Sequence, residues 1–242
     1  MANNVLLNNI DHSDLKIAQR HGAEFGDSVN QALVFPTEFG DVQREYPILF
    51  RKDEDGNFQS VALLGFDKGE NLLLDGAVWR ARHVPVLHQR GPFMIGFQTR
   101  ETGGETRREP VIYVDLDDPR VSRTEGQPLF LPHGGNAPYL EHVSHVLRAI
   151  SLGMDVERKM FRAFEAAALI EPASLDVRLD EHTVYQVPGI YSISEEKLAG
   201  LEGEMLARLH TSGFLRLAYL ALASLSNVNR LIELKNEKRR VA

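Results

Sequence analysis

The stretch that decides the fold reads YPILFRKDEDGNFQSVALLGF at residues 46–66 and continues DKGENLLLDGAVWRARHVPVLHQRGPF at residues 67–93. Short apolar segments alternate in it with polar clusters that favour turns. The clearest pair of segments is ILF and FQSVALLGF, with KDEDGN between them. Asp55-Gly56 tolerates positive φ, so this pattern predicts a β-hairpin. A further strand is expected over residues 78–86.

Strand signals also cover residues 93–99 and 111–116, with the turn-rich segment ETGGETRRE between them. Short strands at this spacing indicate a mainly antiparallel, twisted sheet or a small barrel. We therefore expect an α+β fold divided as follows: an irregular lead-in with a short helix at 1–45, an antiparallel β region at 46–118, a loop at 119–138, and a helix-rich region at 139–242. The β region and the helix-rich region are either separate or one continuous domain.

Apolar residues from Leu140 onward recur at helical spacing, and Gly153 interrupts them, which predicts two helices or one kinked helix. Ser194 is expected to begin another helix that runs to about residue 210. The last helix, over residues 214–236, is apolar on more than half of its circumference, so it is buried or covered by a partner. The second alternative predicts a homodimer through Phe214, Leu217, Leu225 and Val228. The basic segment KNEKRR at 235–240 is expected to complement the negative end of this helix.

Composition sets limits on the class of protein. The 242 residues are 43% hydrophobic and 25% charged, as in soluble globular proteins. There is no cysteine, which excludes disulfides, thiolate metal sites and a thiol nucleophile. A net charge of −7 argues against nucleic acid as a partner. Neither a secretory signal nor a transmembrane segment is evident, so we expect a cytoplasmic protein that reaches a surface only by non-standard export.

Polar residues near Trp79, the only tryptophan, form the first candidate site. Arginines and histidines at positions 80, 82, 83, 88 and 90 indicate a site for an anion or a peptide terminus. Ordinary turn residues, charges on a strand face, and a core tryptophan are the competing interpretations. The residues predicted to bind a ligand are Glu70, Asn71, Trp79, Arg90 and Phe93.

Histidines suggest a second candidate site. His142 and His145 lie three residues apart beside Glu141, and His133 lies shortly before them. Imidazole and carboxylate ligands suit zinc or iron. Surface or capping histidines are the alternative, and the pattern does not require a cofactor. No serine lies in a nucleophile-elbow pattern, so a hydrolase is not supported.

The order and the amino-acid sequences of several segments resemble those of the SapC family of bacterial proteins. The segments are YPILF at 46–50, LLGFDKGENLLLD at 63–75, Trp79, VPVLHQRGPF at 84–93, QPLF at 127–130, GIYSISEEKLAGL at 189–201 and SGFLRLAYLALASLSNVNRLIEL at 212–234. The chain departs from the family at Gln89-Arg90-Gly91, where members tend to have two basic residues and an aromatic one. The resemblance implies a link to the cell surface, from which the family takes its name, or to nutrient and peptide handling, because members tend to be encoded near such systems.

Three hypotheses for the function follow. The first is a non-enzymatic binding or accessory protein for a peptide or protein partner, with a sheet surface as the recognition groove. The second is a metal-dependent, peptide-modifying enzyme of the oxygenase type that uses the histidines. The third is a structural component of a surface layer.

Overall fold

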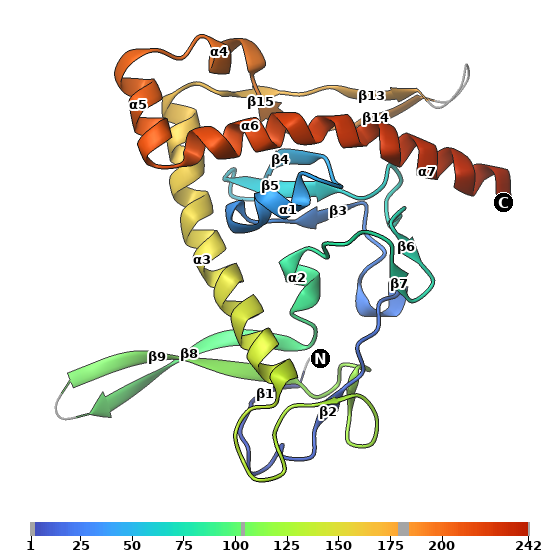
Figure 1. The fold of residues 1–242 in the computed structure, drawn as a ribbon, viewed down its shortest axis with the longest axis vertical. Coiled ribbons are helices and arrows are strands. Elements are labelled where there is room, and N and C mark those ends of the chain that lie inside the picture. The colour runs from blue at the N-terminus through green and yellow to red at the C-terminus, as the bar shows by residue number, and fades with distance from the viewer. Residues whose placement is uncertain (1–2, 103–104, 179–183, 242) are drawn as a thin grey trace. The chain divides into compact units, whose positions relative to one another are not determined.

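The computed structural model describes residues 3–102, 105–178 and 184–241 of the chain. It has an α+β fold with antiparallel sheets and long helices (Figure 1). The chain forms two compact units, each made of two segments. Unit 1 comprises residues 1–21 and 86–151, and unit 2 comprises residues 22–85 and 152–242. Within the described residues, no helix is both long and apolar enough to cross a membrane.

Unit 2 is built on a five-stranded antiparallel sheet. Its strand order is β12 (Ile170–Pro172), β15 (Ile190–Ile193), β4 (Ile48–Lys52), β5 (Phe58–Leu63) and β3 (Gln31–Leu33). The predicted hairpin is confirmed, because β4 pairs with β5 across a turn in which Asp53 accepts the N–H groups of Asp55 and Asn57. Gly56 adopts a φ of 83°, as the sequence requires.

Helices cover this sheet. The helix α6 (Phe214–Ser224) packs on it, and Ser224 Oγ accepts the N–H of Ile48 at 2.7 Å (Figure 1). A short 3-10 turn (Leu225–Asn227) connects α6 to α7 (Val228–Val241), so the last helix is divided near its middle. The four residues predicted to form a homodimer lie partly buried against the core of unit 2: Phe214, Leu217, Leu225 and Val228. The protein's own core therefore accounts for the wide apolar face, and the homodimer stays a prediction.

The remaining elements of unit 2 are short. They are η1 (Ala23–Phe25), η2 (Pro36–Glu38), α1 (Phe39–Val42), the paired strands β6 (Leu74–Asp75) and β7 (Val78–Trp79), the paired strands β13 (Leu175–Arg178) and β14 (Val184–Val187), α4 (Glu195–Ala199) and α5 (Gly203–Thr211). The helix expected over residues 194–210 is two helices, because the chain leaves helical geometry after Ala199 and Glu202 is extended, with a φ of −136° and a ψ of 168°.

The strand expected over residues 78–86 is wrong beyond Trp79. The N–H groups of Arg82 and His83 bond to the carboxylate of Glu45 instead of a neighbouring strand. Pro85 has no N–H to offer a sheet. The chain then enters the short helix α2 (Val86–Gln89).

Unit 1 holds two small sheets. One has the order β1 (Asn4–Leu6), β9 (Glu105–Asp115) and β8 (Phe93–Thr102), and the other β10 (Val121–Ser122), β2 (Lys16–Ile17) and β11 (Gln127–Pro128). The strands β8 and β9 continue through most of the segment predicted as turn-rich, apart from residues 103–104, which lie outside the described residues. The strands of the stretch 46–118 therefore lie in several separate sheets.

The helix α3 (Pro138–Ala166) is a single helix of 29 residues, so of the two predicted alternatives the pair of separate helices is wrong. Its first part belongs to unit 1 and its second part to unit 2. Gly153 is needed for close packing inside unit 2. A Cβ atom at this position would lie 2.5 Å from the Cβ atom of Phe35.

Candidate functional site

A hollow of about 600 Å³ lies on unit 2, and most of its lining is charged. We call it the arginine hollow. Residues 41–45 and Arg230 of α7 meet there with residues 80–83, which follow Trp79. The lining residues are Asp41, Arg44, Glu45, Arg80, Arg82, His83 and Arg230.

Two aromatic residues, Tyr46 and Trp79, fix the segment that carries His83 of the arginine hollow. The buried hydroxyl of Tyr46 accepts a hydrogen bond from Trp79 Nε1 at 2.7 Å and donates one to the carbonyl oxygen of His83. Burial raises the pKa of Tyr46, so the hydroxyl keeps its proton and remains a donor. Trp79 is only 7% exposed. It therefore positions the chain behind the hollow and is not an exposed anchor.

Glu45 fixes the backbone of Arg82 and His83, which line the hollow. One carboxylate oxygen accepts the N–H groups of Arg82 at 2.8 Å and His83 at 3.2 Å. The other accepts a hydrogen bond from Arg230 at 3.3 Å. One half-buried carboxylate thus joins the chain after Trp79 to α7, because the charged hydrogen bonds that it accepts are stronger than neutral ones.

His83 is oriented by a different carboxylate, that of the buried Glu38. Its Nε2 lies 2.7 Å from Oε2 of Glu38, while Oε1 of Glu38 accepts the N–H of Phe35 at 3.0 Å. Glu38 is 5% exposed. A histidine fixed in this way presents a defined ring edge to whatever enters the hollow.

The four guanidinium groups of the hollow differ in their partners. Arg44 pairs with Asp41 at 3.4 Å, Arg80 with Asp75 at 2.6 Å and Arg230 with Glu45 at 3.3 Å. The exposed side chain of Arg82 forms no ion pair or hydrogen bond with any residue that the structure describes. Arg82 therefore has its full set of donors available for an anionic group.

A second hollow of about 450 Å³ shares Arg80 with the first. Asn71 lines the second hollow, but its side chain is already hydrogen-bonded to the backbone of the protein. Its amide donates to the carbonyl of Asp27 at 2.9 Å, and its oxygen accepts the N–H of Leu73 at 3.0 Å.

Glu70 is 7% exposed and is not among the lining residues of the second hollow, although its partner Lys238 is. It accepts hydrogen bonds from Lys235 at 2.8 Å and 2.9 Å and from Lys238 at 3.1 Å. Burial by itself would raise the pKa of Glu70, but the two lysines outweigh this effect and lower it. Of the segment 235–240, which was predicted to complement the negative end of the last helix, Lys238, Arg239 and Arg240 lie in the last turn of α7. Lys235 is instead buried and forms the centre of an ion cluster with Glu70 and Asp67.

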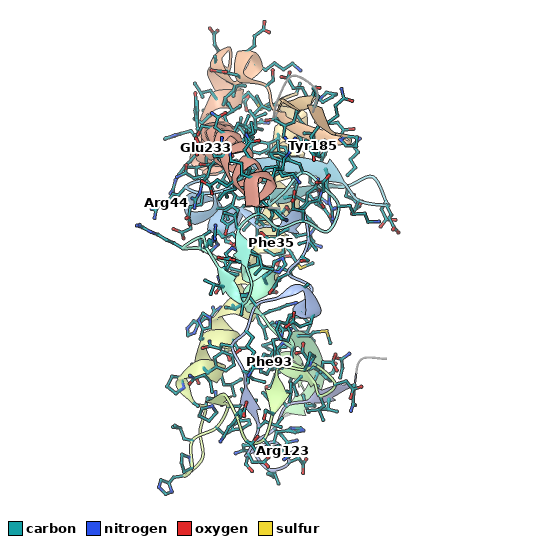
Figure 2. The ribbon with its side chains drawn as sticks, turned by 90° about the vertical axis from the view of Figure 1, so that its right-hand side faces the viewer. Phe35, Arg44, Phe93, Arg123, Tyr185 and Glu233 are labelled. Atoms are coloured by element: carbon teal, nitrogen blue, oxygen red, sulfur yellow. The ribbon has the colours of Figure 1, made fainter. Side chains whose placement is uncertain are left out.

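The other two predicted ligand-binding residues, Arg90 and Phe93, belong to unit 1. Phe93 is fully buried in the core of that unit (Figure 2). His88 belongs to unit 1 as well, so the predicted anion site is divided. The structure brings Arg80, Arg82 and His83 together in the arginine hollow.

The predicted metal ligands are not gathered into a centre. In the part of the chain that the structure describes, no group of three or more His, Asp or Glu side chains is arranged to hold an ion. His145 Nδ1 lies 2.7 Å from the carbonyl oxygen of Glu141, and the Glu141 carboxylate accepts the side-chain amide of Asn136. His133 is exposed in the loop before α3.

Sequence reasoning missed Glu38, Arg44, Glu45 and Arg230. Glu45 directly precedes the Tyr46 segment, but its bonds to residues 82 and 83 span a sequence separation of more than 30 residues. Arg230 lies 185 residues from Glu45, and no spacing rule connects the two.

The family model for SapC matches residues 7–231, which include most of both units and every residue of the arginine hollow. The chain belongs to the SapC family. Searches of curated proteins and of solved structures give no match. For this SapC-family chain, the side chains themselves are therefore the basis for a function.

Proposed function

We propose that this SapC-family protein is a non-enzymatic binding or accessory protein, and that its arginine hollow recognises carboxylates on an acidic peptide or protein segment. The uncommitted guanidinium of Arg82 is the observation that supports the proposal most directly. Guanidinium groups bind carboxylates through paired, charge-assisted hydrogen bonds.

Preorganisation also supports a recognition role. Glu45 fixes the backbone at Arg82 and His83, and Tyr46 fixes the carbonyl of His83, before any ligand arrives. A site fixed in this way loses less conformational entropy on binding. Among the lining residues, the four arginines outnumber the two carboxylates, Asp41 and Glu45, which favours a ligand of negative charge.

The proposal is tested by calorimetric titration with two capped octapeptides, one alternating Glu and Ser and the other alternating Gln and Ser. The acidic peptide is expected to bind, and more weakly at high salt, whereas the neutral peptide is not. Arg82→Gln is expected to weaken binding roughly tenfold or more, the cost of one charged hydrogen-bond pair.

Arg162→Gln is the matched control, because it removes the same charge from an exposed arginine of α3 in unit 2. It is expected to bind the acidic peptide as the wild-type protein does. Equal affinity for both peptides, no binding of either, or equal losses in Arg82→Gln and Arg162→Gln would each contradict the proposal.

A further inference from the structure

A second group of cationic and hydroxyl side chains lies in unit 1, where the functional proposal does not use it. Arg90 follows α2, and its guanidinium donates to the carbonyl oxygen of Phe93 at 3.4 Å. The ring of Phe93 packs on that of Tyr139, with 6.4 Å between the centroids. The Tyr139 hydroxyl lies beside Gly91, 3.8 Å from the place where a Cβ atom would stand. Arg90 and Tyr139 are thus held close together by the same short segment.

Arg120 adds a second guanidinium to this group. It pairs with Asp118 through two parallel hydrogen bonds of 2.9 Å and 2.6 Å, and the two side chains are only 12% and 15% exposed. The charges of Arg120 and Asp118 act on the Tyr139 hydroxyl, and the charge of Arg120 also acts on Arg90. The nearby carboxylate is therefore committed to Arg120.

Arg90 has no carboxylate partner among the residues that the structure describes. Apart from the long hydrogen bond to Phe93, its guanidinium contacts no acceptor among the described residues. Burial, and then the charge of Arg120, lower the pKa of Arg90. A partly buried guanidinium with a like charge nearby and most of its five donors unused is an unfavourable arrangement for the protein alone.

The Tyr139 hydroxyl is a donor without a partner within the described part of the chain. Burial raises the pKa of Tyr139, which keeps the hydroxyl protonated. The guanidinium of Arg90 and the phenol of Tyr139 match the oxygens of a bound anion, which would supply Arg90 with a negative charge and both groups with acceptors.

We propose that Arg90 and Tyr139 form an oxyanion-binding site in unit 1 that takes a carboxylate or phosphate group. This site is distinct from the arginine hollow, because its residues belong to the other unit. It does not depend on the proposed function, since either site can bind its ligand without the other.

The test uses the full chain carrying Arg44→Gln and Arg82→Gln, so that the arginine hollow contributes little to anion binding. Inorganic phosphate and acetate are titrated in separate calorimetric experiments at constant ionic strength, and the stronger ligand identifies the class of oxyanion. Adding Arg90→Gln is expected to weaken binding roughly tenfold or more, and adding Tyr139→Phe to weaken it by a smaller factor.

Arg148→Gln is the matched control, because Arg148 is an exposed arginine on the unit 1 part of α3. It is expected to leave binding unchanged. Arg90→Lys keeps the charge but loses the planar fork, so it is expected to bind phosphate with intermediate affinity.

Thermal unfolding separates a binding role from a structural one. Without phosphate or acetate, the Arg90→Gln protein is expected to melt at the same temperature as the Arg148→Gln protein or higher, since an unpaired charge has been removed. The proposal would be overturned by equal anion affinity in these two variants, by no binding of either anion, or by a melting temperature lowered in Arg90→Gln with anion binding intact.

Discussion

Lys235 illustrates how a single residue obtains a partner that its neighbours in sequence do not reveal. Lys235 is separated in the sequence from Asp67 by 168 residues and from Glu70 by 165 residues, yet its ammonium group contacts both carboxylates. Burial would lower the pKa of Lys235, but hydrogen bonds to the two carboxylates raise it to about 12. The ring of Tyr185 lies 5.3 Å from the ammonium and adds a cation–π contact.

Replacing Lys235 by Met is expected to destabilise the protein by about 3 kcal/mol, because Glu70 remains buried with only Lys238 beside it. Urea denaturation followed by the fluorescence of Trp79 measures this change. Adding Glu70→Gln is expected to restore most of the lost free energy of unfolding, because this second substitution removes the buried negative charge that Lys235→Met leaves without its main partner. The control Lys159→Met removes an exposed lysine of α3 and is expected to change the free energy of unfolding little.

The same cluster predicts a dependence of stability on pH. The lowered pKa of Glu70 stabilises the fold above its ordinary value of 4.5, and this contribution is lost as the pH falls through the folded-state pKa. The raised pKa of Lys235 stabilises the fold below its ordinary value of 10.5, and this contribution is lost as the pH rises through about 12. The difference in unfolding free energy between wild type and Lys235→Met is therefore expected to be largest between about pH 5 and pH 10. A difference independent of pH would contradict an electrostatic origin.

At the scale of elements, α3 shows why a glycine in a helical pattern is ambiguous. Glycine lowers helix propensity, so residue 153 resembles a break in the sequence. In the structure the helix continues, and Gly153 instead allows Phe35 and Thr37 to approach its backbone. Close packing compensates for the unfavourable propensity.

Gly153→Ala is expected to lower the free energy of unfolding by about 1–2 kcal/mol, although alanine is the better helix former. The added Cβ atom would lie 2.5 Å from Cβ and 2.8 Å from Cγ of Phe35, so one of the two elements must shift. Chemical denaturation measures the loss. In a Phe35→Gly background, which lacks both of these atoms, the substitution is expected to cost less. Leu152→Ala, at an exposed neighbouring position, provides the control for helix propensity. A stabilising effect of Gly153→Ala would show that the contact with Phe35 is easily relaxed.

At the scale of the whole molecule, both units are discontinuous in sequence. Unit 1 needs residues 1–21, because β1 pairs with β9 and β2 pairs with β10 and β11. Leu15 and Ile17 from this segment also belong to its core. The amino-terminal segment that appears irregular in sequence is therefore a structural part of unit 1.

Deleting residues 1–21 is expected to expose the amides of unit 1 while leaving those of unit 2 protected. Hydrogen exchange read by mass spectrometry should show faster exchange over residues 113–115 of β9, which lose their neighbour β1, and over residues 93–98 of β8, which pair with β9. Exchange over β4 and β5 should be unchanged. A chain lacking only residues 1–2 is the control. Equal loss of protection in β4 and β5 would mean that the two units unfold together.

The sequence by itself determined the α+β class, the β4–β5 hairpin, the helical character of the carboxy-terminal half and the SapC family, because these depend on local periodicity, turn chemistry and segment order. It also indicated that the arginines after Trp79 are suited to an anion. Only the tertiary structure decided that Trp79 and Phe93 are core residues, that Glu70 pairs with Lys235, and that Arg44 and Arg230 join Arg82. Burial and ion pairing are properties of side chains that meet across long sequence separations, and no local pattern encodes which distant residues will meet.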